Sequence, residues 1–347
     1  MIYKNIKFYI NIFLFFVYSY DIIINLFFSL KIFILKKFHN NILIHVDLSG
    51  IKDFHGPGNF IKGINNILPF ITNNCIFSSK EYINNILQPD YFYFPWPKFD
   101  ERDFDFLLNK NLINQYILGP TFVPTYWPYF PLTNNWKEKR FSEILNITKG
   151  IVIHSKRVRD YLAQRSNTTN NLKKYIIMRA CTNIKPRTIK SFKKRKIDII
   201  FFEKYMDLNR QKNGEELYSL LSKTNKTIVT MKYGKYEKKY MKKLANNSKF
   251  IIYFSFYDTG AIGLKEIQNY GVLSFTLQED LVIDNETSFY IPELANQDNM
   301  ILASEKIIDI MNKISKKNPK SDLIAEKNQK INKCENALKD FCESLFQ

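Results

Sequence analysis

Short apolar runs alternate with longer stretches of helical periodicity from residue 41 to the end of the chain. NILIHVDL (41–48) is predicted to be a buried strand, and NFIKGINNILPFI (59–71), which follows a glycine-bearing loop, repeats apolar residues at helical spacing. This alternation predicts an α/β fold with parallel sheets. Further strands are predicted at 75–79, 91–94, 115–119, 150–155 and 173–181, and a helix at 156–165.

A second series of strands and helices follows a polar, basic stretch that contains Pro186. Its strands are predicted at 197–203, 227–233 and 249–255, and its helices at 214–223, 236–247, 300–316 and 320–346. We therefore expect two successive α/β domains joined by a basic linker. The predicted boundaries are 1–40 for a hydrophobic N-terminal segment, 41–183 for the first domain, 184–196 for the linker, 197–330 for the second domain and 331–347 for a C-terminal helix.

The amino-terminal stretch 8–35 is apolar almost throughout, and its charged residues are Asp21 and Lys31. It is long enough for a membrane anchor, since a bilayer span needs roughly 20 apolar residues. Asp21 would cost about 2.5–3.5 kcal/mol on insertion, and the alternative is an amphipathic helix that lies on the globular part. If the stretch inserts, the lysine distribution predicts that the bulk of the chain stays cytoplasmic. The lysines compared are Lys31, Lys36 and Lys37 against Lys4 and Lys7.

The chain carries 51 basic and 33 acidic residues, a formal charge of +18, which favours anionic partners. Its many Lys, Asn, Ile, Phe and Tyr residues are typical of an AT-rich coding sequence, so part of this charge follows from composition. The sequence has no zinc-finger spacing, basic zipper or recognition-helix pattern, and we expect no specific nucleic-acid partner.

The four cysteines are widely spaced and form no CxxC pair. We therefore expect neither a disulfide framework nor a zinc site, and the cytoplasm is the predicted compartment. Asn-x-Ser/Thr matches are expected by chance in an Asn-rich chain and do not argue for secretion. The cysteines are Cys75, Cys181, Cys334 and Cys342, and the matches begin at Asn146, Asn167, Asn225, Asn246 and Asn285.

Candidate chemistry lies in FIIYFSFYDTGAIGLKE (250–266), where an apolar strand ends in a glycine-bearing turn and a helix follows. Ligands of open α/β sheets bind beyond the carboxyl ends of the strands, near helix amino termini. Gly260 and Gly263 would let a ligand approach the backbone, and Glu266 could accept two hydrogen bonds from a vicinal diol such as ribose. The alternative is structural, with Asp258 or Thr259 capping the helix and Glu266 in solvent.

The seven residues between Asp258 and Glu266, in a strand–turn–helix unit, resemble the donor-site signature of retaining GT-B glycosyltransferases of the family 4 type. That family has glutamate at both positions, so Asp258 departs by one methylene. The downstream segment NYGVLSFTLQEDLVIDNETSFYIPE is also similar. The resemblance implies two Rossmann-like domains facing each other across a cleft, with Glu266 on the nucleotide ribose and Asp258 on the donor sugar. It also implies backbone contacts with the sugar and phosphates from Gly260, Ala261, Ile262, Gly263 and Leu264.

The family's diphosphate clamp would fall on Lys204 and Lys212, with Arg210 as a substitute, although Glu203 replaces the usual glycine. Such cations stabilise a leaving diphosphate without a metal. The alternative for these lysines is an ordinary place on the surface of a lysine-rich chain.

In the first domain, HGPGNFIKG resembles the family's glycine-rich loop, which faces the donor phosphates, through Gly56 and Gly58. His154 in IVIHS resembles the family's cleft histidine near the donor sugar, although a lone histidine is more often structural. The aromatic stretches 94–99 and 122–131 fall in the acceptor half and could stack on sugars or lie at a membrane interface. Ordinary loop packing is their alternative.

These features predict a hexosyltransferase-type enzyme of glycan biosynthesis. It would move a sugar from a nucleoside-diphosphate donor to a glycan, lipid or protein acceptor, with retention implied by the resemblance. We expect no cofactor and no metal, because no DxD-type motif stands at a predicted strand end. The alternatives are a nucleotide-sugar epimerase of the same fold and a non-enzymatic basic protein that associates with membranes or nucleic acid.

Overall fold

The computed structural model describes residues 26–48, 51, 56–79, 87–95, 115–120, 148–165, 172, 174–204, 208–255, 260–282, 284–295 and 297–346. The chain forms two compact units, one of residues 1–47 and 68–93 and the other of residues 48–67 and 94–347. The predicted domain boundaries stay predictions.

The first unit contains a helical segment at 26–38 and strands in the order β2-β3-β1-β4. β1 runs parallel to β3 and β4, and β2 runs antiparallel to β3. The helical segment buries Ile32 against Leu43 of β1 and Ile76 of β3. The strands are β1 (Ile42–Val46), β2 (Phe70–Ile71), β3 (Cys75–Ser78) and β4 (Tyr91–Phe94).

This packing gives the carboxyl-terminal part of the apolar stretch 8–35 a place on a folded sheet, as the amphipathic alternative expects. Residues 8–25 lie outside the described part of the chain. Within the described ranges, no helix combines the length and apolar character that crossing a membrane requires.

The second unit begins with α2 (Gly56–Asn65) and the parallel strands β5 (Tyr116–Leu118), β6 (Gly150–Ile153) and β7 (Tyr175–Ile177), with α6 (Lys156–Arg165) after β6.

The prediction of one helix across 59–71 was wrong. The helix ends at Asn65, because Pro69 disfavours helical backbone at the residue before it, and residues 70–71 form β2 instead. The predicted loop position of Gly56 and Gly58 was also wrong, because both lie in the first turn of α2.

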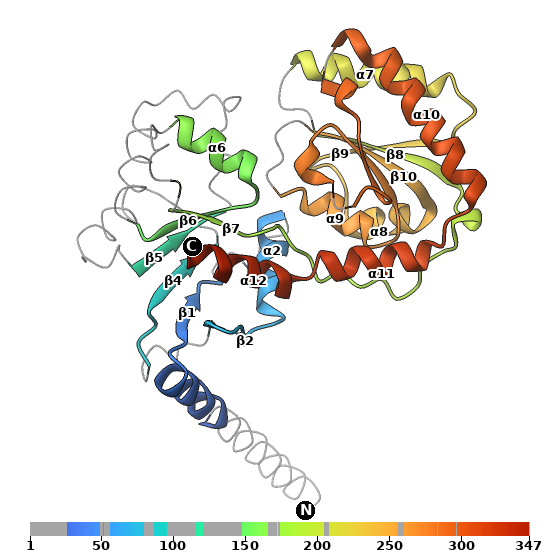
Figure 1. The fold of residues 1–347 in the computed structure, drawn as a ribbon. Coiled ribbons are helices and arrows are strands. Elements are labelled where there is room, and N and C mark those ends of the chain that lie inside the picture. Colours follow the sequence, from blue (N-terminus) through green and yellow to red (C-terminus); the bar gives the residue numbers. More distant parts are fainter. Residues whose placement is uncertain are drawn as a thin grey trace, which may run out of the picture. The chain divides into compact units, whose positions relative to one another are not determined.

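The second unit also contains a five-stranded parallel sheet in the order β12-β11-β10-β8-β9. Figure 1 labels its strands β8, β9 and β10. Its helices agree with the predicted ones except that α7 begins earlier and the last predicted helix is divided into α11 and α12. The strands are β8 (Ile197–Glu203), β9 (Ile228–Lys232), β10 (Ser248–Phe254), β11 (Leu273–Thr276) and β12 (Ser288–Tyr290). The helices are α7 (Leu208–Ser222), α8 (Lys238–Asn247), α9 (Ile262–Gln268), α10 (Met300–Lys317), α11 (Ser321–Ile331) and α12 (Cys334–Leu345).

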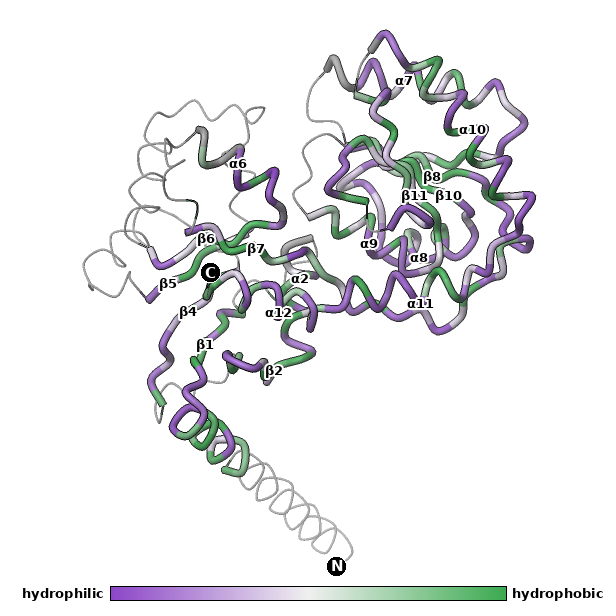
Figure 2. Tube along the Cα trace, viewed as in Figure 1, coloured by the Kyte–Doolittle hydropathy of each residue, from purple (hydrophilic) through white to green (hydrophobic). Residues whose placement is uncertain are grey.

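Side chains of β8 and β10 alternate between two cores, because successive residues of a strand point to opposite faces. Phe201 and Phe250 pack with α7 and α10 on one face. Phe202 and Tyr253 pack with α8 and α9 on the other. Each fully buried side chain of this size contributes about 1.5–3 kcal/mol. The central strands are therefore apolar on both faces, and Figure 2 shows them as hydrophobic.

Arg195 fastens the predicted basic linker to this sheet. Arg195 is 2% exposed, and its guanidinium donates to the carbonyl oxygens of Lys190, Ser248, Tyr270 and Gly271, at 3.1, 2.6, 2.6 and 3.2 Å. Burial lowers its pKa to about 10, so it stays protonated near neutral pH. This basic residue is a structural group inside the fold.

Candidate active site

Helix α9 follows β10 along the chain, as the sequence predicts. Residues 256–259 lie outside the described part of the chain, so the position of Asp258 is not described. Ala261 has φ 45° and ψ 41°, a left-handed conformation that costs a non-glycine residue roughly 1–2 kcal/mol. Because α9 follows β10, a parallel strand at the centre of the sheet, its start lies at the carboxyl edge, where open α/β sheets bind ligands.

Glu266 is a buried carboxylate of α9, with 3% of its surface exposed. Lys238, the first residue of α8, places its Nζ 3.1 Å from Glu266 Oε1 and donates to Asn59 Oδ1 of α2 at 2.8 Å. Burial raises the pKa of Glu266, and the ammonium groups of Lys238 and Lys242 oppose that rise. The solvated helix glutamate of the structural alternative is therefore excluded, and Glu266 belongs to a polar cluster joined by α2, α8 and α9.

His154 follows β6 and lies beside the start of α9. Its Nδ1 is 2.9 Å from the carbonyl oxygen of Met178, and its ring meets Phe60 edge-on with centroids 5.5 Å apart. An ideal Cβ built on Gly260 would lie 2.8 Å from His154 Cδ2 and 2.9 Å from Ala180 Cβ. The structure therefore brings His154 and Gly260 together, and glycine is the residue that this approach permits.

The two predicted clamp lysines differ in their surroundings. Lys204 follows β8, its backbone N–H donates to Phe254 O at 3.2 Å, and its Nζ lies 4.5 Å from the ring centroid of Tyr233. It is therefore at the carboxyl edge of the sheet, beside the strand that leads to α9. Lys212 is exposed on α7. Arg210 is also in α7, but its side chain is outside the described part.

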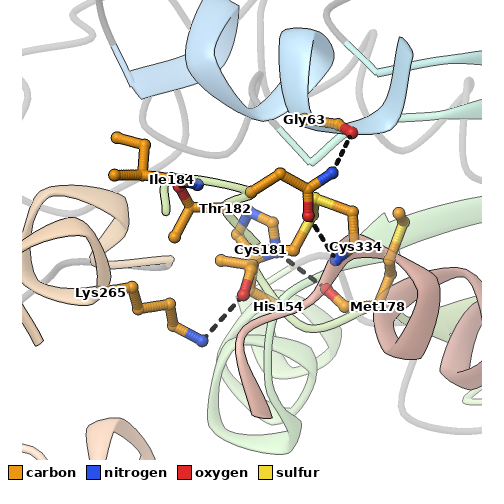
Figure 3. Close-up of a disulfide and its surroundings, with 10 residues drawn as sticks. Gly63, His154, Met178, Cys181, Thr182, Ile184, Lys265 and Cys334 are labelled. Carbon is orange, nitrogen blue, oxygen red and sulfur yellow. Dashed lines mark hydrogen bonds between the residues drawn. A yellow bond between two sulfur atoms is a disulfide. The ribbon is translucent and has the colours of Figure 1, made fainter. Parts of the chain in front are cut away.

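The segment 178–184 links His154 and α9 to two other parts of the second unit (Figure 3). Lys265 of α9 donates to Ala180 O at 2.8 Å, and Asn183 Nδ2 donates to Gly63 O of α2 at 2.9 Å. Cys181 forms a disulfide with Cys334, the first residue of α12. The expectation of no disulfide was wrong, because residues far apart in the sequence meet at this segment and no spacing rule for nearby cysteines detects that.

Comparisons with known proteins find likeness in structure alone. No family model matches the sequence, and no curated protein matches it. Sucrose-phosphate synthase from Thermosynechococcus elongatus has a TM-score of 0.50 and 8% identity, over 88% of this chain and 99% of that one. The chain has a GT-B fold.

Two further solved structures show weaker likeness. TarM from S. aureus has a TM-score of 0.42 and 10% identity, over 83% of this chain and 59% of its own. This chain therefore spans less than two thirds of that structure. A protein from Listeria monocytogenes described as a UDP-N-acetylglucosamine 2-epimerase has a TM-score of 0.43 and 11% identity, over 88% of this chain and 97% of its own.

An open cavity of about 560 Å³ lies beyond the carboxyl ends of β11 and β12 of the GT-B fold. Gln278, 5% exposed, donates to Ser255 O and accepts from Arg157 of α6 at 2.6 Å. Arg157 also pairs with Asp280 at 2.9 Å. The cavity is lined by Arg157, residues 277–280, Tyr290 and Ala295.

Local sequence patterns did not reveal the residues that accompany Glu266 or those that line this cavity. Lys238 shares a helical face with the buried Met241 and Ala245 of α8, and that spacing was the available signal. Asn59, Arg157 and Gln278 carry no local pattern that sets them apart. The aromatic stretch 122–131 lies outside the described residues, as do residues 96–99 of the other stretch.

Proposed function

We propose that this protein is a glycosyltransferase that uses a nucleoside-diphosphate sugar. In the reaction, the bond between the sugar C1 and the β-phosphate oxygen breaks, and C1 bonds to an acceptor hydroxyl oxygen. The hydroxyl proton leaves and the nucleoside diphosphate is released. We further propose retention at C1 and a glycan, lipid or protein acceptor, following the resemblance of the 258–266 segment.

The observation that carries the proposal is the buried Glu266 carboxylate in the helix after β10. A carboxylate has about four lone-pair sites, so it can accept from Lys238 and from a ribose diol together. Burying a carboxylate costs free energy, and a role in ligand binding would explain why the fold buries this one. The GT-B fold supports the proposal, because it places this helix at the ligand-binding edge of a parallel sheet.

The other proposed roles follow the reaction. Asp258 contacts the donor sugar, and the backbone from Gly260 to Leu264 contacts the sugar and phosphates. Lys204, with Lys212 or Arg210, neutralises the charge that develops on the leaving diphosphate, which is the largest electrostatic demand of such a transfer. His154 lies beside Gly260 and would hydrogen-bond the sugar through its Nε2.

A panel of nucleoside-diphosphate sugars tested by calorimetric titration checks the proposal on the full chain. We expect one donor to bind, and Glu266→Gln to weaken binding by about 10- to 100-fold, since hydrogen bonds to charged groups contribute about 1.5–3 kcal/mol. Glu305→Gln is the matched control, because Glu305 is exposed on α10, which packs on the face of the sheet opposite α8 and α9. Equal affinity in Glu266→Gln and Glu305→Gln, or no binding by any donor, would contradict the proposal.

Product analysis separates transfer from epimerisation. A transferase releases the nucleoside diphosphate only as an acceptor is consumed. An epimerase changes the sugar and needs no acceptor. A basic binding protein would instead bind polyanions with strong salt dependence and respond to no particular donor.

A further inference from the structure

The Cys181–Cys334 disulfide joins two buried residues that are 153 positions apart. Their Cα atoms are 5.0 Å apart, within the range of native disulfides. Hydrogen bonds hold the same two segments together: Thr182 N donates to Asn332 O at 3.0 Å, and Cys334 N donates to Asn183 Oδ1 at 3.3 Å. The fold itself therefore aligns the two sulfur atoms, and bond formation requires only an oxidant.

Closing this bond removes two protons and two electrons from a pair of thiols. A protein disulfide of an oxidoreductase can accept the electrons and becomes a dithiol. Disulfides of this kind form and persist in oxidising compartments, whereas the cytosol keeps thiols reduced. The expectation of a cytoplasmic chain depended in part on the absence of disulfides, and the structure removes that part of its basis.

We propose that the chain folds in an oxidising, secretory-type compartment and that Asn225 is an N-glycosylation site there. In the modification, Asn225 Nδ2 bonds to C1 of a lipid-linked oligosaccharide. The bond between that C1 and the lipid diphosphate breaks, and one amide proton is lost. The sequence Asn225-Lys226-Thr227 meets the acceptor rule, because the middle residue is not proline.

Asn225 is placed well for a bulky glycan. It lies in the turn between α7 and β9, and both Asn225 and Thr227 are exposed. The turn precedes β9, so it lies at the amino edge of the five-stranded sheet, which we call the second sheet. Glu266 and Lys204 are at the carboxyl edge, because the strands are parallel. A glycan on Asn225 therefore leaves the proposed donor site open.

The other described acceptor sequences are less accessible. Asn246 Oδ1 accepts from Lys190 N at 2.9 Å, and the hydroxyl of Ser248 is buried against Leu244 O. Asn285 is exposed, but Thr287 is 3% exposed and its hydroxyl donates to Asn328 Oδ1 at 3.4 Å. Asn225 is thus the one match within the described ranges whose asparagine and hydroxyl residue both face solvent.

The lysine distribution around residues 8–35 is a weak argument against this proposal. Lys31, Lys36 and Lys37 exceed Lys4 and Lys7 by a single residue. Lys36 also pairs with Asp90 at 3.2 Å in the folded unit, so its charge is partly neutralised there. A buried disulfide is the more specific indicator of the compartment in which a chain folds.

Expression of the full chain in cultured mammalian cells tests both parts of the proposal. Glycosidase release in ¹⁸O-water converts a glycosylated asparagine to labelled aspartate, and peptide mass spectrometry locates it. Digestion without reduction shows whether the Cys181 and Cys334 peptides are joined. We expect labelled residue 225 together with the joined peptides. An unlabelled Asn225, or separate Cys181 and Cys334 peptides, would overturn the proposal.

Matched substitutions assign the modification to this site. Thr227→Ala removes the acceptor hydroxyl but leaves Asn225 in place, and we expect loss of one glycan as a gel-mobility shift. Thr227→Ser keeps the hydroxyl and should keep the glycan, and Asn246→Gln should change nothing. Because Thr227 is exposed, neither replacement at this position disturbs the core. Loss of the shift in Asn246→Gln and not in Thr227→Ala would overturn the assignment.

Discussion

Glu266 shows at the scale of one residue how the fold keeps a charge out of water. Its carboxylate is surrounded by α8 and α9, and the Lys238 ammonium lies 3.1 Å from Oε1. Burial raises the pKa of Glu266, while Lys238 and Lys242 lower it. Tyr270 faces the same carboxylate, whose charge raises the tyrosine pKa further. Substitutions in the Glu266–Lys238 pair should therefore affect both the stability of the fold and ligand binding.

Replacing Lys238 with methionine should make stability more dependent on pH. The pKa of Glu266 is already above its ordinary 4.5 in the folded state, and loss of the ammonium raises it further. The folded state then binds the proton more tightly than the unfolded state. The free energy of unfolding therefore falls as the pH rises from the unfolded pKa through the folded one. In urea denaturation, the free energy of unfolding of Lys238→Met should be lower than that of the unchanged chain by about 1–3 kcal/mol near neutral pH. The difference should be much smaller near pH 4.5.

Glu266→Gln supplies the control for this pH dependence. In the Glu266→Gln background, Lys238→Met should leave the pH profile of stability unchanged, because no carboxyl remains to titrate. Lys242 and Tyr270 are the same in every variant. If Lys238→Met lowers the free energy of unfolding by the same amount from acidic to neutral pH, the proposed pairing of Lys238 with Glu266 is contradicted.

At the scale of elements, local patterns located the strands of the second sheet well. β8 coincides with its predicted range because a run buried on both faces is apolar throughout. The start of α7 was missed, since its first turns hold the polar LNRQKN and lack an apolar period. α2 was displaced because its amino-terminal glycines resemble a loop. Element type therefore follows from the sequence more readily than element ends.

The junction between β6 and α9 should distinguish two glycines that look equivalent in the sequence. A Cβ on Gly260 would lie under 3 Å from His154 and Ala180, so Gly260→Ala should lower the free energy of unfolding by about 1–3 kcal/mol. A Cβ on Gly263 would lie 3.4 Å from Tyr236 Oη, an ordinary contact. Gly263→Ala should be neutral or stabilise the chain by about 0.5–1 kcal/mol through helix propensity. Thermal denaturation of both variants provides the comparison, and equal effects would rule out close packing at Gly260.

At the scale of the whole molecule, the sequence predicted a GT-B fold through the resemblance of its 258–266 segment to a known family. It did not predict the meeting of Cys181 with Cys334, or of Lys238 with Asn59, because these contacts depend on how distant segments pack. Single-sequence patterns describe neighbours along the chain. The residues around Glu266 come from α2, α8 and α9, so the site is only partly visible to such patterns.

Loss of the disulfide should be costly, because it closes a long loop in the unfolded chain. Because the two cysteines are 153 positions apart, replacing both by serine should lower the free energy of unfolding by about 2–5 kcal/mol in urea denaturation. Cys181→Ser alone and Cys334→Ser alone should each lose nearly as much as the double variant, because each breaks the same bond. Losses that simply add in the double variant would contradict the disulfide.

The same bond also divides the chain mechanically. Cys181 and Cys334 close a covalent ring, and all five strands from β8 to β12 lie inside it. Tension that reaches Cys181 and Cys334 from outside the ring passes between them through the sulfur atoms and bypasses the strands. While the bond is closed, the second sheet therefore bears no pulling force.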